Sequence, residues 1–277
     1  MSQEKIPLAG VIGSPIAHSK SPQIHMHWLK VNGLRGHYIP MDVGADDLEN
    51  VLRTLPRMGF VGVNITVPHK EKVLEIADLV TDRATLIGAA NTLIFRKDGK
   101  IHADNTDGYG FIQNLKQYAP TWNPKAGPAA VLGAGGAARA VIAALLNEGV
   151  PEIVISNRTR VRAEALKTEF GKRLNVVDWV QAGNMMEDAA MLVNTTSLGM
   201  MGKPPLRVPL DGLRKGTLVT DLVYAPLKTR LLAEAEEMGC VTVDGLGMLL
   251  HQAVPAFERW FGVRPEVDSA TRAAALR

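Results

Sequence analysis

The chain has 277 residues, of which 46% are hydrophobic and 21% are charged, and its formal net charge is +3 at pH 7. A chain of this length favours two domains, and its small, scattered basic excess argues against a nucleic-acid partner. No apolar run approaches the roughly 20 residues of a membrane span, and the single cysteine, Cys240, fits a reducing compartment, so we expect a cytoplasmic protein without a signal peptide, a disulfide or a membrane partner.

Apolar runs of strand length alternate with segments of helical period almost throughout, which predicts the α/β class with largely parallel sheets. In the first part of the chain, strands are expected at 8–12, 38–43, 60–66 and 87–95, and helices at 21–32, 46–58 and 69–80. Ser21 offers a capping hydroxyl to the first helix, and Pro22 follows where no N–H is needed. The turn at 97–100 predicts a hairpin, and therefore one antiparallel strand pair.

A further helix is expected at 107–118, and the breaker-rich segment 120–128 then leads into a new sheet. Beyond it, strands are expected at 129–132, 152–156, 175–178, 191–194, 217–223 and 241–243, with helices that end at Glu148 and span 160–170. The sequence therefore predicts two adjoining α/β units.

The segment 13–22 carries more polar chemistry than a strand-to-helix turn needs. Ser19 and Ser21 flank Lys20, and His18 precedes them, although one capping hydroxyl would be enough for the helix. The residues alone leave the purpose of the second hydroxyl open.

A glycine-rich loop follows the strand expected at 129–132. It reads Gly133-Ala134-Gly135-Gly136-Ala137-Ala138 and opens a helix, which is the strand–turn–helix context of a dinucleotide-binding loop. Gly133 suits the tight turn, Gly135 allows a pyrophosphate to approach the backbone, and Ala138 suits close helix packing. An ordinary tight turn is the alternative interpretation of the glycines alone.

The end of the next strand favours NADP over NAD. An NAD site places an acidic residue there to bind the ribose 2′-hydroxyl, whereas this chain has Asn157, Arg158 and Thr159. The guanidinium of Arg158 can stack on adenine and donate to a 2′-phosphate. For Arg160 a solvated side chain is an equal alternative. The missing acid also argues against an S-adenosylmethionine enzyme, whose ligand has the same diol.

Two polar segments could carry chemistry. Lys70 opens the helix expected at 69–80, where the positive end of the helix dipole favours a neutral lysine that can act as a general base. A solvated lysine is the other interpretation. Asp107, in the segment 104–108, could hold a substrate hydroxyl and pair with a lysine, or could simply cap a helix. Neither this segment nor the seven histidines form a metal signature, so no metal is expected.

Taken together, these motifs resemble the shikimate dehydrogenase family over nearly the whole chain. The matching segments are S-K-S (19–21), N-I-T-V-P-H-K (64–70), A-N-T (90–92), D-N-T-D-G (104–108), G-A-G-G-A (133–137), N-R-T (157–159) and D-G-L-G-M-L (244–249). The resemblance implies the NADPH-dependent reduction of 3-dehydroshikimate to shikimate, on the pathway to aromatic amino acids.

The resemblance also implies a role for individual residues. Lys70 and Asp107 match the catalytic pair, and Ser19 and Ser21 match two serines that bind the substrate carboxylate. The other implied substrate ligands are Thr66, Asn91, Tyr224 and Gln252, and the implied cofactor residues are Gly133, Ala134, Gly135, Gly136, Ala137, Asn157, Arg158, Thr159, Gly245, Gly247 and Met248.

The family further implies a substrate domain of residues 1–107 and 245–277, with a Rossmann NADP-binding domain of residues 108–244 inserted into it and catalysis in the cleft between the two. A monomer or homodimer with a small-molecule substrate is expected. Two rival interpretations are a quinate-oxidising relative, which Ser19, Ser21 and Arg158 disfavour, and a non-catalytic NADPH-binding regulator, which Lys70 and Asp107 disfavour.

Overall fold

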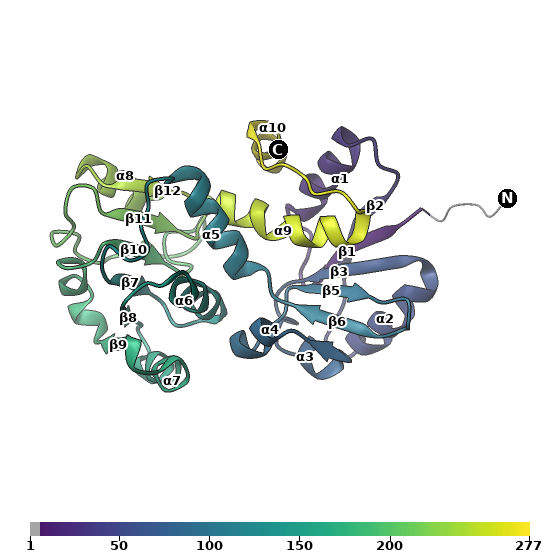
Figure 1. Ribbon diagram of the computed structural model, residues 1–277, viewed down its shortest axis with the longest axis horizontal. Helices are drawn as coiled ribbons and strands as arrows, with labels where there is room; N and C mark the ends of the chain where they lie inside the picture. The colour runs from purple at the N-terminus through teal and green to yellow at the C-terminus, as the bar shows by residue number, and fades with distance from the viewer. Residues whose placement is uncertain (1–5) are drawn as a thin grey trace. The chain divides into compact units, whose positions relative to one another are not determined.

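The structure is a computed structural model that describes residues 6–277. The chain divides into two compact units, one formed by residues up to Thr106 together with Leu250–Arg277 and the other by Asp107–Leu249. Each unit contains a six-stranded sheet, which confirms the α/β class (Figure 1). Among the described residues, no helix is both long and apolar enough to cross a membrane.

The sheet of the first unit has the order β2-β1-β3-β5-β6-β4. Its strands are β1 (Leu8–Gly13), β2 (His37–Asp42), β3 (Phe60–Ile65), β4 (Leu79–Val80), β5 (Thr92–Phe95) and β6 (Ile101–Asp104). Among the strands that the structure describes in this sheet, β5 alone runs antiparallel to its neighbours, β3 and β6. The expected hairpin is therefore confirmed as the β5–β6 pair.

Helices pack on both faces of this first sheet. The helices of this unit are α1 (Ser21–Val31), α2 (Leu48–Thr54), α3 (Val73–Ile76), α4 (Asp82–Ile87), α10 (Ser269–Ala275) and the C-terminal part of α9 (Leu246–Phe261), with the 3-10 helix η1 (Leu55–Met58). Trp260 of α9 donates from Nε1 to the carbonyl of Leu93 at 3.3 Å. A Cβ atom on Gly62 of β3 would lie 2.0 Å from that Nε1. The C-terminal segment thus packs tightly on the first sheet.

Two segments of the first unit differ from expectation. The helix expected at 69–80 is instead a turn that lasts to residue 72, the short α3 and then β4, because the chain becomes extended at Ala77 and returns to the sheet. The strand expected at 87–95 begins only at Thr92, because α4, capped by Thr81, ends at Gly88 in a left-handed conformation. Ser21 does not cap α1, whose N-cap is Lys20 without a side-chain bond.

The sheet of the second unit is entirely parallel and has the order β12-β11-β10-β7-β8-β9. Its strands are β7 (Ala129–Leu132), β8 (Ile153–Ser156), β9 (Leu174–Val177), β10 (Met191–Asn194), β11 (Leu218–Asp221) and β12 (Val241–Val243). This is the doubly wound order of a Rossmann fold, in which the strand order reverses between β7 and β10.

Two hydrophobic clusters cover the faces of this second sheet. Its helices are α5 (Asp107–Tyr118), α6 (Gly136–Glu148), α7 (Arg160–Phe170) and α8 (Arg230–Glu237), with the 3-10 helices η2 (Gly171–Arg173), η3 (Trp179–Gln181) and η4 (Asn184–Met186). The expected helices 107–118 and 160–170 and the strands 129–132, 191–194 and 241–243 are confirmed. Helix α9 continues from the second unit into the first as a single helix, and the limits of the two functional domains stay a prediction.

Candidate functional site

Most of the predicted substrate residues of the first unit follow or precede strands at one edge of the first sheet. Ser19 and Ser21 come after β1, Thr66 comes directly after β3, and Asn91 directly precedes β5. Because β5 is antiparallel, its first residue lies beside the last residues of β3 and β6, in the row Asn64, Thr92 and Asp104. Ligands of α/β sheets bind at the carboxyl ends of the parallel strands, which is this edge.

The two serines lie in a loop that is held against the segment after β3. The backbone N–H of Ser21 donates to Ser19 Oγ at 3.3 Å, and the N–H of Ser14 donates to the carbonyl of Val67 at 3.1 Å. A Cβ atom on Gly13 would lie 2.5 Å from Thr66 Cγ2, so the strand end needs a glycine. Both hydroxyls stand at the N-terminal end of the eleven-residue helix α1, which favours an anion.

Lys70 lies in the turn after β3, so the argument from a helix dipole is wrong for this residue. Its backbone is held from two sides. Buried His69 bonds the carbonyl of Val43 through Nε2 at 2.7 Å, and the carbonyl of Lys70 accepts from the N–H of Ala90 at 2.8 Å. The lysine is therefore fixed next to the segment that carries Asn91.

The side-chain amide of Asn91 is held by neighbouring donors. Its Oδ1 accepts from the N–H of Thr106 at 2.9 Å, from Thr106 Oγ1 at 3.1 Å and from Thr92 Oγ1 at 3.1 Å. Its Nδ2 donates to Oε1 of Gln252, on α9, at 3.0 Å. The structure thus brings two predicted substrate residues, 161 positions apart in sequence, into direct contact.

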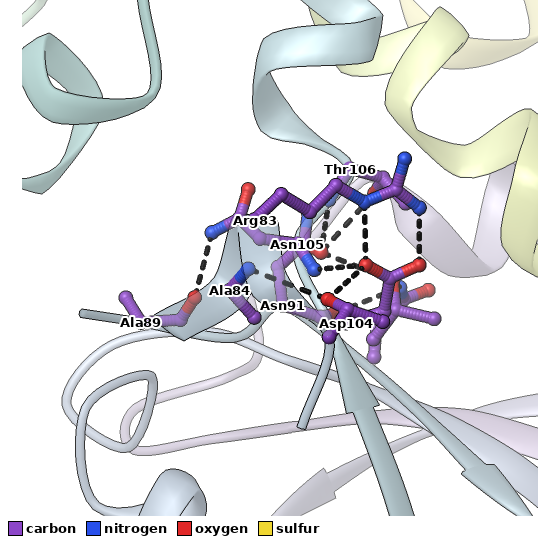
Figure 2. A network of polar contacts seen from close by, with 10 residues as sticks. Arg83, Ala84, Ala89, Asn91, Asp104, Asn105 and Thr106 are labelled. Atoms are coloured by element: carbon purple, nitrogen blue, oxygen red, sulfur yellow. Dashed lines mark hydrogen bonds and ion pairs between the residues drawn. The ribbon is translucent and has the colours of Figure 1, made fainter. Parts of the chain in front are cut away.

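An ion pair between Arg83 and Asp104 holds the end of β6, next to Asn91 (Figure 2). Asp104, at the end of β6, accepts from Arg83 Nε at 2.6 Å, from Thr81 Oγ1 at 2.8 Å and from the N–H of Asn105 at 2.8 Å. Burial by itself would raise the pKa of Asp104, but the bonds from Arg83 and Thr81 outweigh it and hold the pKa below its ordinary value. Asn105 Nδ2 also donates to the carbonyl of Ala89 at 2.9 Å, which joins β6 to the residues before Asn91.

Asp107 is the first residue of α5 and of the second unit. It comes directly after Thr106, whose backbone N–H donates to Asn91 Oδ1.

The glycine-rich loop of the second unit has the geometry of a phosphate-binding turn. Gly133 has a φ of 105°, and a Cβ there would lie 2.6 Å from Thr195 Oγ1, so both its conformation and its surroundings require glycine. Gly135 and Gly136 are exposed, and no atom lies within 4 Å of a Cβ built on either. Ala134 and Ala137 flank them, and the N-terminus of α6 therefore stays open to an anion.

Next to this loop, a cavity of about 570 Å³ opens at the ends of β8 and β10. It is lined by Asn157, Arg158, Thr159, Arg162, Trp179, Thr196, Ser197, Leu198, Pro204, Pro205 and Arg207. Three guanidinium groups in one cavity suit a phosphate, so the site fits the phosphorylated nucleotide NADP.

Arg160 does not share in this cavity. It donates to Asp178 at 2.7 Å and to Glu164 at 2.8 Å, so its charge is already paired on the surface. Arg162 and Arg207 were not among the cofactor residues predicted from the sequence. Arg162 could have been noticed as a cation in the first turn of a helix, where the dipole disfavours it. No local signal marks Arg207.

The loop with Tyr224 is held by a buried carboxylate. Asp221, at the end of β11, accepts from Asn194 Nδ2 at 2.9 Å, from the N–H of Val223 at 3.0 Å and from Thr229 Oγ1 at 2.7 Å. Burial raises the pKa of Asp221 and also that of half-buried Tyr224. Asn194, Asp221 and Thr229, which no sequence motif marks, therefore position this loop.

Packing explains two glycines at the start of α9. A Cβ on Gly245 would lie 2.4 Å from the carbonyl oxygen of Leu222, and one on Gly247 would lie 1.7 Å from Asn114 Oδ1. Met248 is half-buried and packs against the core of the second unit. A cofactor role for these three residues stays a prediction. Among the described residues, no group of three or more His, Cys, Asp or Glu side chains could hold a metal ion.

Three family models match the chain. The Shikimate dehydrogenase substrate binding domain matches residues 11–93, Shikimate / quinate 5-dehydrogenase matches residues 119–200, and the Shikimate 5'-dehydrogenase C-terminal domain matches residues 245–275. A Cereibacter sphaeroides protein named shikimate dehydrogenase (NADP(+)) is 72% identical over 98% of each chain.

Solved structures are similar over the same extent. The shikimate 5-dehydrogenase of Thermus thermophilus, in complex with NADP(H) and shikimate, is 40% identical, has a TM-score of 0.86 and is covered over 98% of both chains. A quinate dehydrogenase from Corynebacterium glutamicum in complex with NAD is 33% identical with a TM-score of 0.89, over 97% of this chain and 98% of that one.

Proposed function

Because the chain belongs to the shikimate dehydrogenase family, we propose that it catalyses the reversible, NADPH-dependent reduction of 3-dehydroshikimate to shikimate. It is an NADP-dependent oxidoreductase. The observation that supports this function best is the pair of donor sets: serine, threonine, lysine and amide groups at one edge of the first sheet, and an open glycine loop beside a three-arginine cavity in the second.

The first unit is proposed as the substrate domain and the second as the cofactor domain. Ser19 and Ser21 would donate their hydroxyls to the substrate carboxylate, which also gains from the N-terminal end of α1. Thr66, Asn91, Gln252 and Tyr224 would bind the ring hydroxyls. Hydroxyl and amide groups suit this task because they bind neutral polar groups without the desolvation cost of buried charges.

Lys70 is proposed to exchange a proton with the substrate oxygen. During reduction, Nζ would give a proton to the oxygen of the ketone as negative charge develops there, and during oxidation it would take the proton back. Asp107 would orient the same hydroxyl group. The turn that fixes Lys70 through His69 and Ala90 supports this role, because a general acid must be held within hydrogen-bond reach of its target.

The proposed cofactor residues lie in the second unit. The backbone of Gly133, Ala134, Gly135, Gly136 and Ala137 would hold the pyrophosphate, and Asn157, Arg158 and Thr159 would bind the adenosine 2′-phosphate. Arg162 and Arg207 line the same cavity and would add to the phosphate site. When bound, NADPH supplies the hydride that the substrate carbon receives. Gly245, Gly247 and Met248 are proposed to lie near its nicotinamide end.

No observation favours the quinate alternative. The fold alone cannot separate the two activities, because a quinate dehydrogenase in complex with NAD has a very similar fold. The three-arginine cavity favours NADP over NAD. A cytoplasmic location, a place in aromatic amino-acid biosynthesis and a monomeric or homodimeric state also belong to this proposal.

The test is the absorbance of NADPH formed from NADP with shikimate, with quinate and NAD in parallel reactions. We expect turnover with shikimate and NADP, and a loss of about 10²- to 10⁴-fold in kcat for Lys70→Ala, as for a missing general acid–base. Comparable efficiency with quinate or NAD would contradict the proposed specificity. Binding of NADPH without turnover of either substrate would favour a regulator.

A further inference from the structure

A buried chain of hydrogen bonds links three of the proposed substrate residues in the first unit. Ser21 donates to Tyr38, and Tyr38 Oη donates to Asn64 Oδ1 at 2.7 Å. Asn64 Nδ2 donates to Thr92 Oγ1 at 3.2 Å, and Thr92 Oγ1 donates to Asn91 Oδ1 at 3.1 Å. The last bond runs from Asn91 Nδ2 to Gln252 Oε1 at 3.0 Å. The members between Ser21 and Gln252 are all nearly inaccessible to solvent.

Two amides fix the direction of this chain. Asn64 Nδ2 also faces the backbone carbonyl of Asn91 at 3.0 Å, which can only accept, so the nitrogen and oxygen of Asn64 cannot be exchanged. Asn91 Oδ1 faces the backbone N–H of Thr106, which can only donate, so Asn91 has one orientation as well. Figure 2 shows Asn91 and Thr106 in this arrangement, next to Asp104.

The orientation of the two amides then determines which way each hydroxyl group donates its proton. Tyr38 has one proton, which it donates to Asn64 Oδ1, so it accepts from Ser21. Burial raises the pKa of Tyr38 well above its ordinary value, so the hydroxyl keeps its proton. Thr92 accepts from Asn64 Nδ2 and gives its own proton to Asn91 Oδ1. Every donor in the chain points the same way, and bonds in such a series strengthen one another.

We propose that Thr92 is a positioning residue for the substrate, an inference that rests on the proposed function. Thr92 is 2% exposed and lies within β5, so its hydroxyl acts through Asn91 and does not touch a ligand. By occupying Asn91 Oδ1, it keeps Asn91 Nδ2 directed at Gln252 and at the substrate. Without this bond Asn91 Oδ1 would be held by the two donors of Thr106 alone, so Asn91 Nδ2 would be directed less firmly at Gln252 and at the substrate.

The test compares Thr92→Val, which keeps the shape and removes the hydroxyl, with Thr92→Ser, which keeps the hydroxyl. We expect Thr92→Val to raise the KM for shikimate about five- to tenfold, the effect of one net hydrogen bond. The kcat and the KM for NADP should stay within about twofold, because Asn91 binds substrate and transition state alike. Thr92→Ser should restore the KM. Thr92→Ala replaces Thr92→Val if the valine variant does not fold.

Two further variants separate positioning from a general effect on the fold. Thr220→Val removes a hydroxyl from an equally buried strand threonine in the second unit and should leave the KM for shikimate unchanged. In an Asn91→Ala background, Thr92→Val should not weaken shikimate binding further, measured as Kd by calorimetry, because its effect passes through Asn91.

An unchanged KM in Thr92→Val would overturn the inference while leaving the proposed function intact. The same holds if Thr92→Ser fails to restore the KM, or if Thr92→Val weakens binding equally with and without Asn91. A lack of turnover with shikimate by the unchanged protein would overturn the proposed function, and this inference with it. These results are distinguishable because the unchanged protein is assayed first.

Discussion

Arg83 and Asp104 form a two-point ion pair in which Arg83 Nε donates to Asp104 Oδ1 at 2.6 Å and Nη2 pairs with Oδ2. The carboxylate is buried, whereas the arginine side chain is about half exposed at 51%. The pair joins α4 to the end of β6, and both neighbouring segments lead to proposed substrate residues. We therefore expect loss of this ion pair to affect both the stability of the protein and the positions of the proposed substrate residues.

We expect Asp104→Asn to lower the free energy of unfolding by about 2–3 kcal/mol, because a buried group loses its charged hydrogen bonds. Asp98→Asn is the matched control, since Asp98 pairs with Arg96 on the surface with both side chains more than 40% exposed. Such an exposed pair is screened by solvent and contributes little to stability, so Asp98→Asn should leave the free energy of unfolding nearly unchanged. Urea unfolding measures both variants, and equal losses would contradict the assignment.

The buried His25 predicts a loss of stability in mild acid. Its ring stacks on Tyr38 with centroids 4.0 Å apart, neither ring nitrogen has a partner, and burial lowers its pKa from 6.5 to about 3. Between these values the unfolded chain binds a proton that the folded protein does not. The free energy of unfolding is thus unaffected by His25 above its unfolded pKa of 6.5, and it decreases as the pH drops from 6.5 toward 3.

At pH 5 this effect amounts to about 2 kcal/mol for His25 alone. We expect His25→Phe, which keeps an aromatic ring against Tyr38, to lose less stability than the unchanged protein between pH 7 and pH 5. Chemical unfolding at both pH values measures the difference. An identical loss in both proteins would show that His25 is not the group responsible.

Arg158 should determine the preference for NADP. We expect Arg158→Ala to raise the KM for NADP by about 10- to 100-fold, the effect of losing charged hydrogen bonds to a phosphate, with little change in the KM for NAD. Arg207→Ala should act in the same direction, because Arg207 lines the same cavity.

Arg160→Ala is the control for these variants, because Arg160 is paired with Glu164 and Asp178 and does not line the cavity. It removes the same charge from the same segment and should leave the KM for NADP within about twofold. A comparable rise in Arg160→Ala would mean that the net charge of the surface, and not the cavity, selects the cofactor.

Gly62→Ala should strongly destabilise the protein. The added Cβ would lie 2.0 Å from Trp260 Nε1 and 2.3 Å from the carbonyl oxygen of Leu93, and the backbone atom cannot move aside easily. We expect a loss of about 3 kcal/mol in the free energy of unfolding. In Gly44→Ala nothing lies within 4 Å of the added atom, so this variant should retain its stability. Similar melting temperatures would contradict the packing argument.

Local signals were sufficient for the second unit. Its strands are short apolar runs and its helices are long enough to show a period, so the limits of α5, α7, β7 and β10 agree with the prediction. The first unit was harder around 68–92. There, elements of two to six residues follow one another, and a pattern this short does not separate a helix from a turn and a strand.

The sequence by itself determined the fold class and the family, and its motifs indicated a dehydrogenase. The glycine loop, the serine pair and Lys70 are recognisable because each belongs to one short segment. Only the tertiary structure decided that Gln252 contacts Asn91, that Arg207 lies with Arg158, and that Thr92 connects Asn64 to Asn91. These contacts join residues on separate strands, helices and loops, and their geometry depends on strand register and close packing, which no local pattern encodes.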